Sequence, residues 1–239
     1  MSSPAWEMRR GILTPAYADA VLSLSPVGYW PLDEAAGTVA RDLDGTNNGT
    51  YVGSPTLGVA GPLVGDNSTA VTFNGSSQYV NCGSGVAVPV TGITVALFVK
   101  ATAPGTARFI ASRGASNQYS WFLYANTNGS VLWSCTNAAS TDSRGITTAG
   151  VLDGNWHFVV GKFDGIITPR LLVDAVPGGS ASGTLGGGGW HKASTAPVEI
   201  AARSEASTLP GSLAHAAIWN RPLSDAEVRY LYDVALGRG

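Results

Sequence analysis

Short runs of alternating apolar and polar residues, separated by clusters of Gly, Asn, Asp, Ser and Pro, fill most of the chain after Val27. A period of two places every second side chain on one face of a β-strand, so the pattern predicts antiparallel strands joined by tight turns. Asn74-Gly75, Asn128-Gly129 and Asp164-Gly165 offer the positive φ values that such turns need. We expect strands at residues 28–32, 50–52, 70–73, 79–82, 93–100, 108–112, 120–124, 131–136, 156–163, 170–174, 198–202 and 213–219.

This many strands implies two stacked sheets in one all-β domain. Of the 239 residues 44% are hydrophobic, and a single open sheet would leave one face of this apolar content in water. A chain of this size buries about 70% of its surface on folding, so it needs no metal or disulfide for stability. Free buried thiols are favoured for Cys82 and Cys135, and a disulfide between neighbouring strands stays an open alternative.

A short helix is predicted before the strands. Thr14 is suited to the N-cap and Pro15 to the first helical position of a helix over residues 15–24, whose apolar face carries Tyr17, Ala20, Val21 and Leu24. Residues 1–13 show no periodicity and are interpreted as an arm. We therefore divide the chain into an arm with a helix at residues 1–25 and one β-domain at residues 26–239.

A second helix is predicted at the end of the chain. Ser224 and Glu227 have the spacing of a capping box, and Leu223 with Val228 that of a hydrophobic staple. Gly237 stands where a C-terminal cap belongs.

Upstream of this helix, the glycine-rich segment of residues 177–189 is expected to hold no regular element and to form a mobile loop that ends at Trp190.

Charge and hydropathy exclude several kinds of partner. The formal net charge is 14 − 16 = −2 without a long run of either sign, which argues against nucleic acid or an anionic membrane as a partner. The longest apolar run, residues 93–99, is far shorter than the roughly 20 residues of a membrane-spanning helix. The first residues lack the apolar stretch of a secretory signal, so we expect synthesis in the cytoplasm.

The acidic residues do not have the spacing of a glycosidase site. Retaining glycosidases need two carboxyl groups about 5 Å apart, which a strand supplies at positions i and i+2 or i+4. Glu199 and Glu205 instead span the end of a strand, and no acid lies between them. Asp33 and Glu34 are adjacent, and beside a turn we expect them to meet solvent or backbone amides. The sequence therefore favours a protein that is not an enzyme.

The histidines do not have the spacing of zinc ligands, and no metal is expected. We expect His157 to pack between strands. His191 lies in the glycine-rich loop, and two interpretations remain for it: a solvated side chain or a contact to a ligand. Trp30, Trp121, Trp156 and Trp219 lie in alternating runs and are assigned to the core.

Three other aromatic residues lie in or beside loops or in the arm. Trp190, Tyr119 and Trp6 are free to stack on a sugar or a partner protein, or to fold back on their own domain. The candidate ligand-binding residues are accordingly Tyr119, Trp190 and His191. The candidate partner-docking residues of the arm are Trp6, Arg9 and Arg10.

Four segments resemble, in this order, laminin-G-like domains of the concanavalin A-like lectin/glucanase fold. They are residues 26–38 with 41–50, residues 70–80, residues 154–165 with 171–174, and residues 211–227. The resemblance implies a jelly roll with a binding or structural role, because the acids of the glucanases are missing. Ala214-His215 stands where members often carry an acidic pair, so no cofactor is expected. Asp42 is the candidate ligand if calcium binds.

Residues 17–30 also resemble the start of minor tail or decoration proteins of tailed phages. This resemblance implies a non-catalytic virion surface protein, oligomeric or part of a larger assembly, with other virion proteins and host-surface glycans as partners. The alternatives are a free carbohydrate-binding lectin and, ranked last, a glycoside hydrolase that uses an unrecognised pair of acids.

Overall fold

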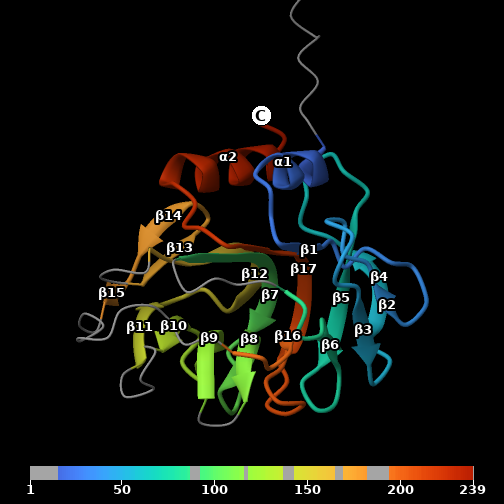
Figure 1. Ribbon diagram of the computed structural model, residues 1–239, viewed down its shortest axis with the longest axis horizontal. Helices are drawn as coiled ribbons and strands as arrows, with labels where there is room; N and C mark the ends of the chain where they lie inside the picture. Colours follow the sequence, from blue (N-terminus) through green and yellow to red (C-terminus); the bar gives the residue numbers. More distant parts are fainter. Residues whose placement is uncertain are drawn as a thin grey trace, which may run out of the picture.

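The protein folds into two stacked antiparallel sheets with a pair of helices on one side (Figure 1). The computed structural model describes residues 16–86, 92–115, 118–136, 143–164, 169–181 and 194–238. The expected two-sheet, all-β sandwich with a helix near each end is confirmed, and the described residues contain no helix long and apolar enough to cross a membrane.

The first sheet lies between the helices and the second sheet. Its strand order is β14-β13-β12-β7-β17-β5-β4, and β1 pairs with β17 outside this path. The strands are β1 (Gly28–Trp30), β4 (Thr56–Ala60), β5 (Thr69–Asn74), β7 (Ile93–Thr102), β12 (Asp153–Phe163), β13 (Arg170–Val173), β14 (Val176–Gly178) and β17 (Pro210–Trp219). The seven residues Ile93–Val99 of β7 are all buried, since this central strand is covered on both faces.

The second sheet has the order β15-β11-β10-β9-β8-β16-β6-β3-β2. Its strands are β2 (Val39–Ala40), β3 (Gly49–Val52), β6 (Tyr79–Asn81), β8 (Arg108–Ala115), β9 (Gln118–Ala125), β10 (Val131–Thr136), β11 (Ser143–Thr148), β15 (Ser180–Ala181) and β16 (Val198–Ile200). The edge strand β2 and its neighbour β3 lie at the right-hand end of Figure 1.

Two apolar cores hold these layers together. The larger core lies between the sheets and includes the indoles of Trp30, Trp121 and Trp133. The second core lies between the first sheet and the helices and includes Phe98, Phe158 and Trp219. The predicted core positions of Trp30, Trp121 and Trp219 are confirmed, whereas Trp156 is only partly buried and packs against the rim of the second core.

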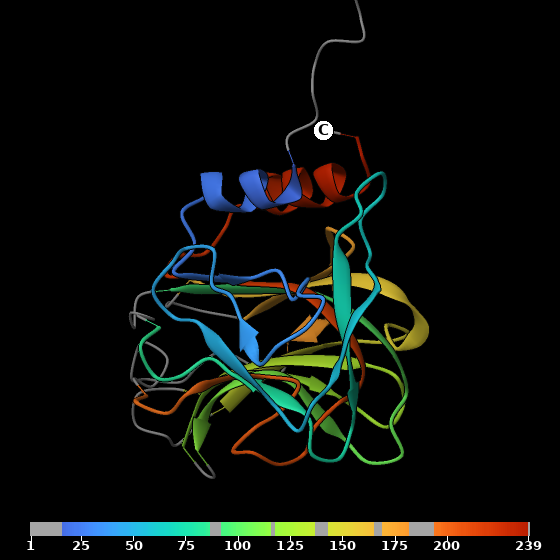
Figure 2. The same cartoon turned by 90° about the vertical axis from the view of Figure 1, so that its right-hand side faces the viewer.

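The two helices, α1 (Tyr17–Ser23) and α2 (Asp225–Ala235), lie together on the first sheet, as Figure 2 shows from the side. The predicted start of α1 is wrong, because Ala16 rather than Thr14 holds the N-cap position and makes no side-chain hydrogen bond there. For α2 the capping box of Ser224 and Glu227 is confirmed.

The end of α2 has the predicted cap. Gly237 adopts a φ of 67°, and its N–H donates to the Val234 carbonyl while the Arg238 N–H donates to the Asp233 carbonyl. This pair of bonds is a Schellman motif, in which a left-handed residue stops the helix.

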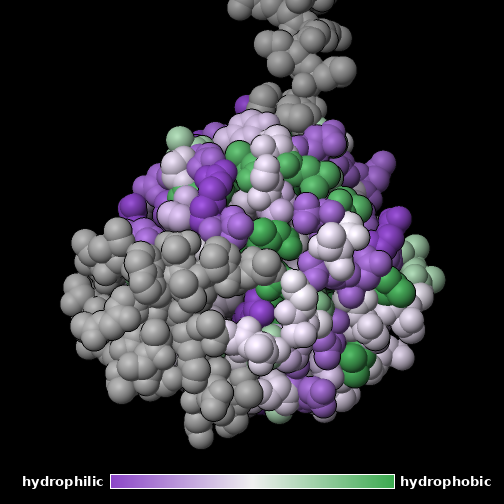
Figure 3. All heavy atoms as spheres, viewed as in Figure 1, coloured by the Kyte–Doolittle hydropathy of each residue, from purple (hydrophilic) through white to green (hydrophobic). Residues whose placement is uncertain are grey.

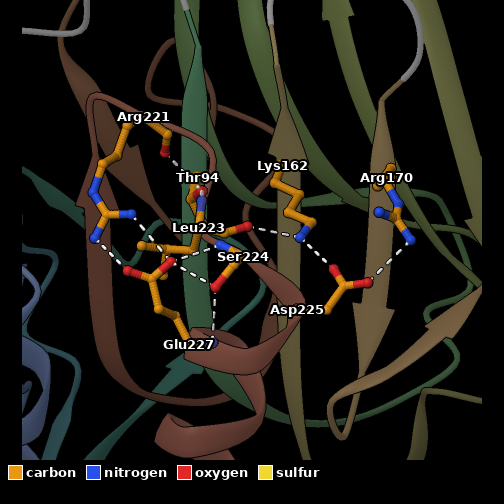
Figure 4. Close-up of polar contacts among 8 residues, drawn as sticks. All are labelled: Thr94, Lys162, Arg170, Arg221, Leu223, Ser224, Asp225 and Glu227. Carbon is orange, nitrogen blue, oxygen red and sulfur yellow. Dashed lines mark hydrogen bonds and ion pairs between the residues drawn. The ribbon is translucent and has the colours of Figure 1, made fainter.

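A polar network attaches the start of α2 to the first sheet (Figure 4). Lys162 of β12 is buried and donates to the Leu223 carbonyl at 2.7 Å and to the Asp225 carboxylate, which also accepts from Arg170 at 3.2 Å. On the other side of the helix start, Arg221 pairs with Glu227 at 2.7 Å. A buried charge is costly unless it is paired. Because the partners of Lys162 are Leu223 and Asp225, this pairing holds the start of α2 on the sheet.

The glycine-rich segment of residues 177–189 departs from the prediction. Its first residues, Pro177 and Gly178, continue β14 and pair with β13, and Ser180–Ala181 forms β15 against β11. The prediction of no regular element is therefore wrong for this part. The neighbouring strands β13 and β11 supply the hydrogen bonds, and the local sequence pattern does not indicate this pairing. The remainder, residues 182–189, lies outside the described residues.

The two cysteines are buried free thiols, as expected. Burial raises the pKa of both thiols well above the usual value, so neither is poised to react.

Candidate functional site

Most of the residues predicted to bind a ligand or a partner lie outside the described residues. These are Trp190, His191, Trp6, Arg9 and Arg10. Tyr119 belongs to β9, but its side chain lies outside the description. These assignments stay predictions.

Asp42, the candidate calcium ligand, is buried and fixes a loop. Its carboxylate accepts the backbone N–H groups of Tyr29 at 2.8 Å, Asp44 at 3.1 Å and Asn47 at 2.9 Å. In return, the Asp42 N–H donates to Oδ1 of Asn48 at 2.9 Å. The carboxylate therefore holds residues 42–48 against β1, while the role in calcium binding stays a prediction. No group of three or more His, Cys, Asp or Glu in the described ranges is arranged to hold a metal ion.

An open hollow of about 650 Å³ lies beside this loop. It is lined by residues 33–39 together with Arg41 and Asn48, and so by the segment that leads from β1 into the edge strand β2. Val39 and, two residues beyond Arg41, Leu43 are 48% and 40% exposed. The volume of the hollow falls within the range of pockets that bind small ligands. Sequence reasoning missed this hollow, which we call the β1–β2 hollow.

Glu34 is fixed in the wall of the hollow by two hydrogen bonds. One carboxylate oxygen accepts the Arg41 N–H at 2.7 Å, and the other accepts the hydroxyl of Tyr51 on β3 at 2.6 Å. The amide contact is the kind expected for this residue beside a turn. Burial and then the bond to Glu34 raise the pKa of Tyr51, so its hydroxyl stays a donor. The hollow thus has a rigid wall anchored on the second sheet.

Asp33 is half-buried and has a different environment. Burial raises the pKa of its carboxyl, and the neighbouring charge of Glu34 adds to the rise. Within the described ranges, no other residue donates a hydrogen bond to this carboxylate, although the Asp33 carbonyl accepts one from Thr69. Asp33 therefore presents an acceptor that a ligand can use.

Asn48 supplies the opposite polarity on the same hollow. Its Oδ1 is occupied by the Asp42 N–H, which fixes the orientation of the amide and leaves Nδ2 as a donor on an exposed residue. With the Arg41 guanidinium, the β1–β2 hollow presents donors and acceptors around a shallow surface of small residues at positions 35–37.

The other acids have structural partners. Glu199 is buried, and its carboxylate accepts the N–H of Glu205 at 3.2 Å. Burial raises the pKa of Glu199, while the backbone bonds of the turn at residues 203–206 oppose this rise. Glu199 therefore holds that turn on the second sheet, and the absence of a hydrolytic role for Glu199 and Glu205 stays a prediction.

His157 of β12 lies opposite Val99 of β7, and its ring also contacts two carboxylates. Its Nδ1 lies 2.8 Å from Asp174 and its Nε2 lies 3.2 Å from Asp153, so both ring nitrogens face carboxylates. Packing between strands is therefore only part of its environment, because Asp174 also reaches the ring from the β13–β14 turn. His215, by contrast, is buried, and its ring contacts the hydroxyls of Tyr29 at 2.9 Å and Ser68 at 3.3 Å.

Hydrophobic side chains do not form one continuous patch on the face seen in Figure 3, where they lie in scattered groups among polar ones. A second hollow of about 300 Å³ lies where the start of α1 meets the end of α2 and the loop of residues 63–66. Two of its lining side chains, Asp66 and Tyr17, carry hydrogen-bonding groups, fewer than in the β1–β2 hollow.

Comparison with known families places the chain. A laminin-G-type model of the concanavalin A-like lectin/glucanases superfamily matches residues 74–229, more than half of the chain. The chain belongs to this superfamily. The residues that line the β1–β2 hollow lie between positions 33 and 48, before the segment that the family model matches. A comparison with curated protein sequences finds no match.

Solved structures share the lectin-like fold at low sequence identity. The receptor binding domain of botulinum neurotoxin C/D mosaic serotype is 11% identical with a TM-score of 0.67, and the match covers 87% of this chain and 51% of that chain. The botulinum neurotoxin serotype D ligand binding domain, solved in complex with N-acetylneuraminic acid, is 10% identical with a TM-score of 0.67 over 90% and 52%. Trypanosoma rangeli sialidase in complex with 2,3-difluorosialic acid is 17% identical with a TM-score of 0.63 over 89% and 33%.

The chain thus spans about half the length of the neurotoxin domains and a third of the sialidase. At these identities the likeness establishes the fold alone.

Proposed function

We propose that this lectin-like jelly roll is a non-catalytic, glycan-binding surface protein of a phage virion, with the β1–β2 hollow as its sugar site. The observation that carries the proposal is the wall of the hollow: Glu34 is locked by Arg41 and Tyr51, while the Asp33 carboxylate beside it is left as an acceptor. A preformed site of this kind loses little entropy when a ligand binds.

The chemistry of the hollow suits a sugar. Neighbouring hydroxyls of a sugar ring both donate and accept, so a carboxylate acceptor at Asp33 and donors at Asn48 and Arg41 can engage one ring together. The exposed Val39, which lines the hollow, offers apolar contact to the C–H face of such a ring. A small, fixed set of polar groups on a shallow surface can bind a sugar ring at the surface without enclosing it.

A glycan array with the full chain tests the binding half of the proposal. We expect Asp33→Asn to weaken binding about tenfold or more, because a hydrogen bond to a charged acceptor contributes roughly 1.5–3 kcal/mol. Asp19→Asn on the exposed side of α1 is the matched control, because it removes the same charge far from the hollow in the sequence and should leave binding unchanged. Absence of any ligand at millimolar concentration, or equal binding by Asp33→Asn, contradicts the proposal.

The virion half rests on the resemblance of residues 17–30 to phage tail and decoration proteins. Under this proposal the arm of residues 1–13, with Trp6, Arg9 and Arg10, docks on the particle. Deleting residues 1–13 should leave a folded domain that binds glycan but is not incorporated into particles. Incorporation of the truncated chain refutes docking by the arm, and glycan binding by a chain that is never found in particles supports the alternative of a free lectin.

One observation favours a second candidate, a glycoside hydrolase. Asp33 and Glu34 line the same hollow, and the pKa of Asp33 is raised by burial and by Glu34. A general acid in a glycosidase is a carboxyl group with a raised pKa. Against this candidate, both Glu34 oxygens already accept hydrogen bonds. Turnover of β-glucans that is abolished by Asp33→Asn or Glu34→Gln would establish the hydrolase and overturn the non-catalytic proposal.

A further inference from the structure

We infer that the β1–β2 hollow selects uncharged sugars and discriminates against sialylated ones. This inference rests on the proposed function, because it concerns the class of sugar that the same hollow takes. It sets this chain apart from the botulinum neurotoxin serotype D domain, which was solved with N-acetylneuraminic acid.

The first step is the balance of charge around the hollow. Two carboxylates, Asp33 and Glu34, and one guanidinium, Arg41, line it. Burial and then Glu34 raise the pKa of Asp33, and Asp66 is a further acid whose charge reaches it. The exposed Asp44 adds another negative charge to the adjoining loop. A sugar carboxylate that enters the hollow therefore meets an excess of like charge.

The second step concerns Arg41, the one cation among the described residues that line the hollow. Bidentate pairing with an arginine is the strongest way to bind a sialic acid carboxylate, and a nearby acid that attracts the same guanidinium weakens it. The charge of Arg41 already lowers the pKa of Asp33 and so acts on the protein's own acid. Glu34 accepts the backbone N–H of Arg41, so the segment that carries this guanidinium is held beside a second carboxylate.

The third step is the polarity of the hydrogen-bonding groups. Asp33 is an acceptor and requires a donor from the ligand, which a hydroxyl supplies and an ionised carboxylate does not. The fixed amide of Asn48 donates through Nδ2, which a sugar hydroxyl oxygen accepts. The pair is thus matched by two hydroxyls of an uncharged ring.

Matched glycans test the inference with the full chain. Each pair differs only by a terminal sialic acid, for example lactose and 3′-sialyllactose, and is titrated by calorimetry at low salt and at 1 M salt. We expect the uncharged member to bind about fivefold more tightly at low salt, since a like-charge contact near 4 Å in water costs about 1 kcal/mol. The ratio should approach one at 1 M salt, where the Debye length is about 3 Å.

Variants localise the effect and separate the possible failures. Asp33→Asn should lower the ratio of uncharged to sialylated affinity, while Asp19→Asn keeps the ratio of the unmodified chain. Equal or tighter binding of the sialylated member, lost in Asp33→Asn, overturns the inference and leaves the proposed function standing. Binding of neither member of any pair overturns both. A ratio that does not change with salt overturns the electrostatic cause.

Discussion

The indole of Trp133 on β10 lies directly against the backbone of Gly161 on β12, across the core between the two sheets. A Cβ atom at residue 161 would lie 2.3 Å from Cδ2 of this ring. The indole Nε1 also donates to the Lys162 carbonyl at 3.2 Å, so the contact joins the sheets by packing and by a hydrogen bond. The approach of the sheets at this point depends on the absence of a side chain on Gly161.

Gly161→Ala should therefore destabilise the fold by about 1–3 kcal/mol, the range for overpacking a well-filled core. Urea unfolding followed by tryptophan fluorescence measures the change. Gly105→Ala is the control, because a Cβ at Gly105 meets no atom within 4 Å. If the two variants unfold at the same urea concentration, the close approach of Trp133 does not constrain the sheets.

Replacing Lys162 tests the attachment of α2. Lys162→Met should lose roughly 1–3 kcal/mol, because the Leu223 carbonyl and the Asp225 carboxylate lose a buried donor. Arg170→Met removes the other cation on Asp225, but Arg170 is 53% exposed and should cost less than about 1 kcal/mol. Thermal unfolding of both variants measures the difference, and equal losses would show that Lys162 does not anchor the helix.

The buried His215 predicts a loss of stability in mild acid. Burial lowers its pKa from 6.5 to about 4, against the weaker effect of Asp66. The unfolded chain therefore binds a proton as the pH falls below 6.5, while the folded chain does not until about 4. The shift corresponds to roughly 3 kcal/mol lost across this window.

His215→Asn removes the titrating group and accepts the φ of 52° at this position better than most residues. The free energy of unfolding of this variant should change less between pH 7 and pH 4 than that of the unmodified chain. Parallel profiles from the two proteins would mean that His215 is not neutral in the fold.

The sequence predicts the strands that carry buried apolar side chains, and it misses those that depend on a neighbour. β4 has no buried side chain and carries Gly58 at a φ of 70°, so hydrophobic alternation does not mark it. β2 and β15 are two residues long, and their hydrogen bonds to β3 and β11 define them. Local pattern reports burial, whereas an edge strand forms by pairing.

The candidate site could not be predicted from the local sequence either, because its contacts join residues that are far apart in the chain. Asp33 and Glu34 were recognised beside a turn, but the Tyr51 hydroxyl that fixes Glu34 belongs to a different strand. The carboxylate of Asp42 likewise acts on Tyr29, thirteen residues away. The first contact depends on the register of the second sheet, and the second joins a loop to β1 of the first sheet. The local sequence specifies neither arrangement by itself.

His157 gives a pH dependence of the opposite sign to that of His215. Burial alone would lower its pKa, but the hydrogen bonds and charges of Asp174 and then Asp153 raise it above 6.5. A raised pKa means that the folded chain holds its proton more tightly than the unfolded chain. The resulting stability is fully present below pH 6.5 and is lost as the pH rises through the folded pKa.

NMR titration of the His157 ring should give a pKa above that of an exposed histidine, and Asp174→Asn should lower it. His157→Gln should remove the decline in stability above pH 6.5, measured by urea unfolding. Asp174→Asn also weakens the bond from the Phe158 N–H at 2.9 Å, so the ring pKa is the decisive measurement. A pKa at or below 6.5 in the unmodified protein would show that the two carboxylates do not outweigh burial.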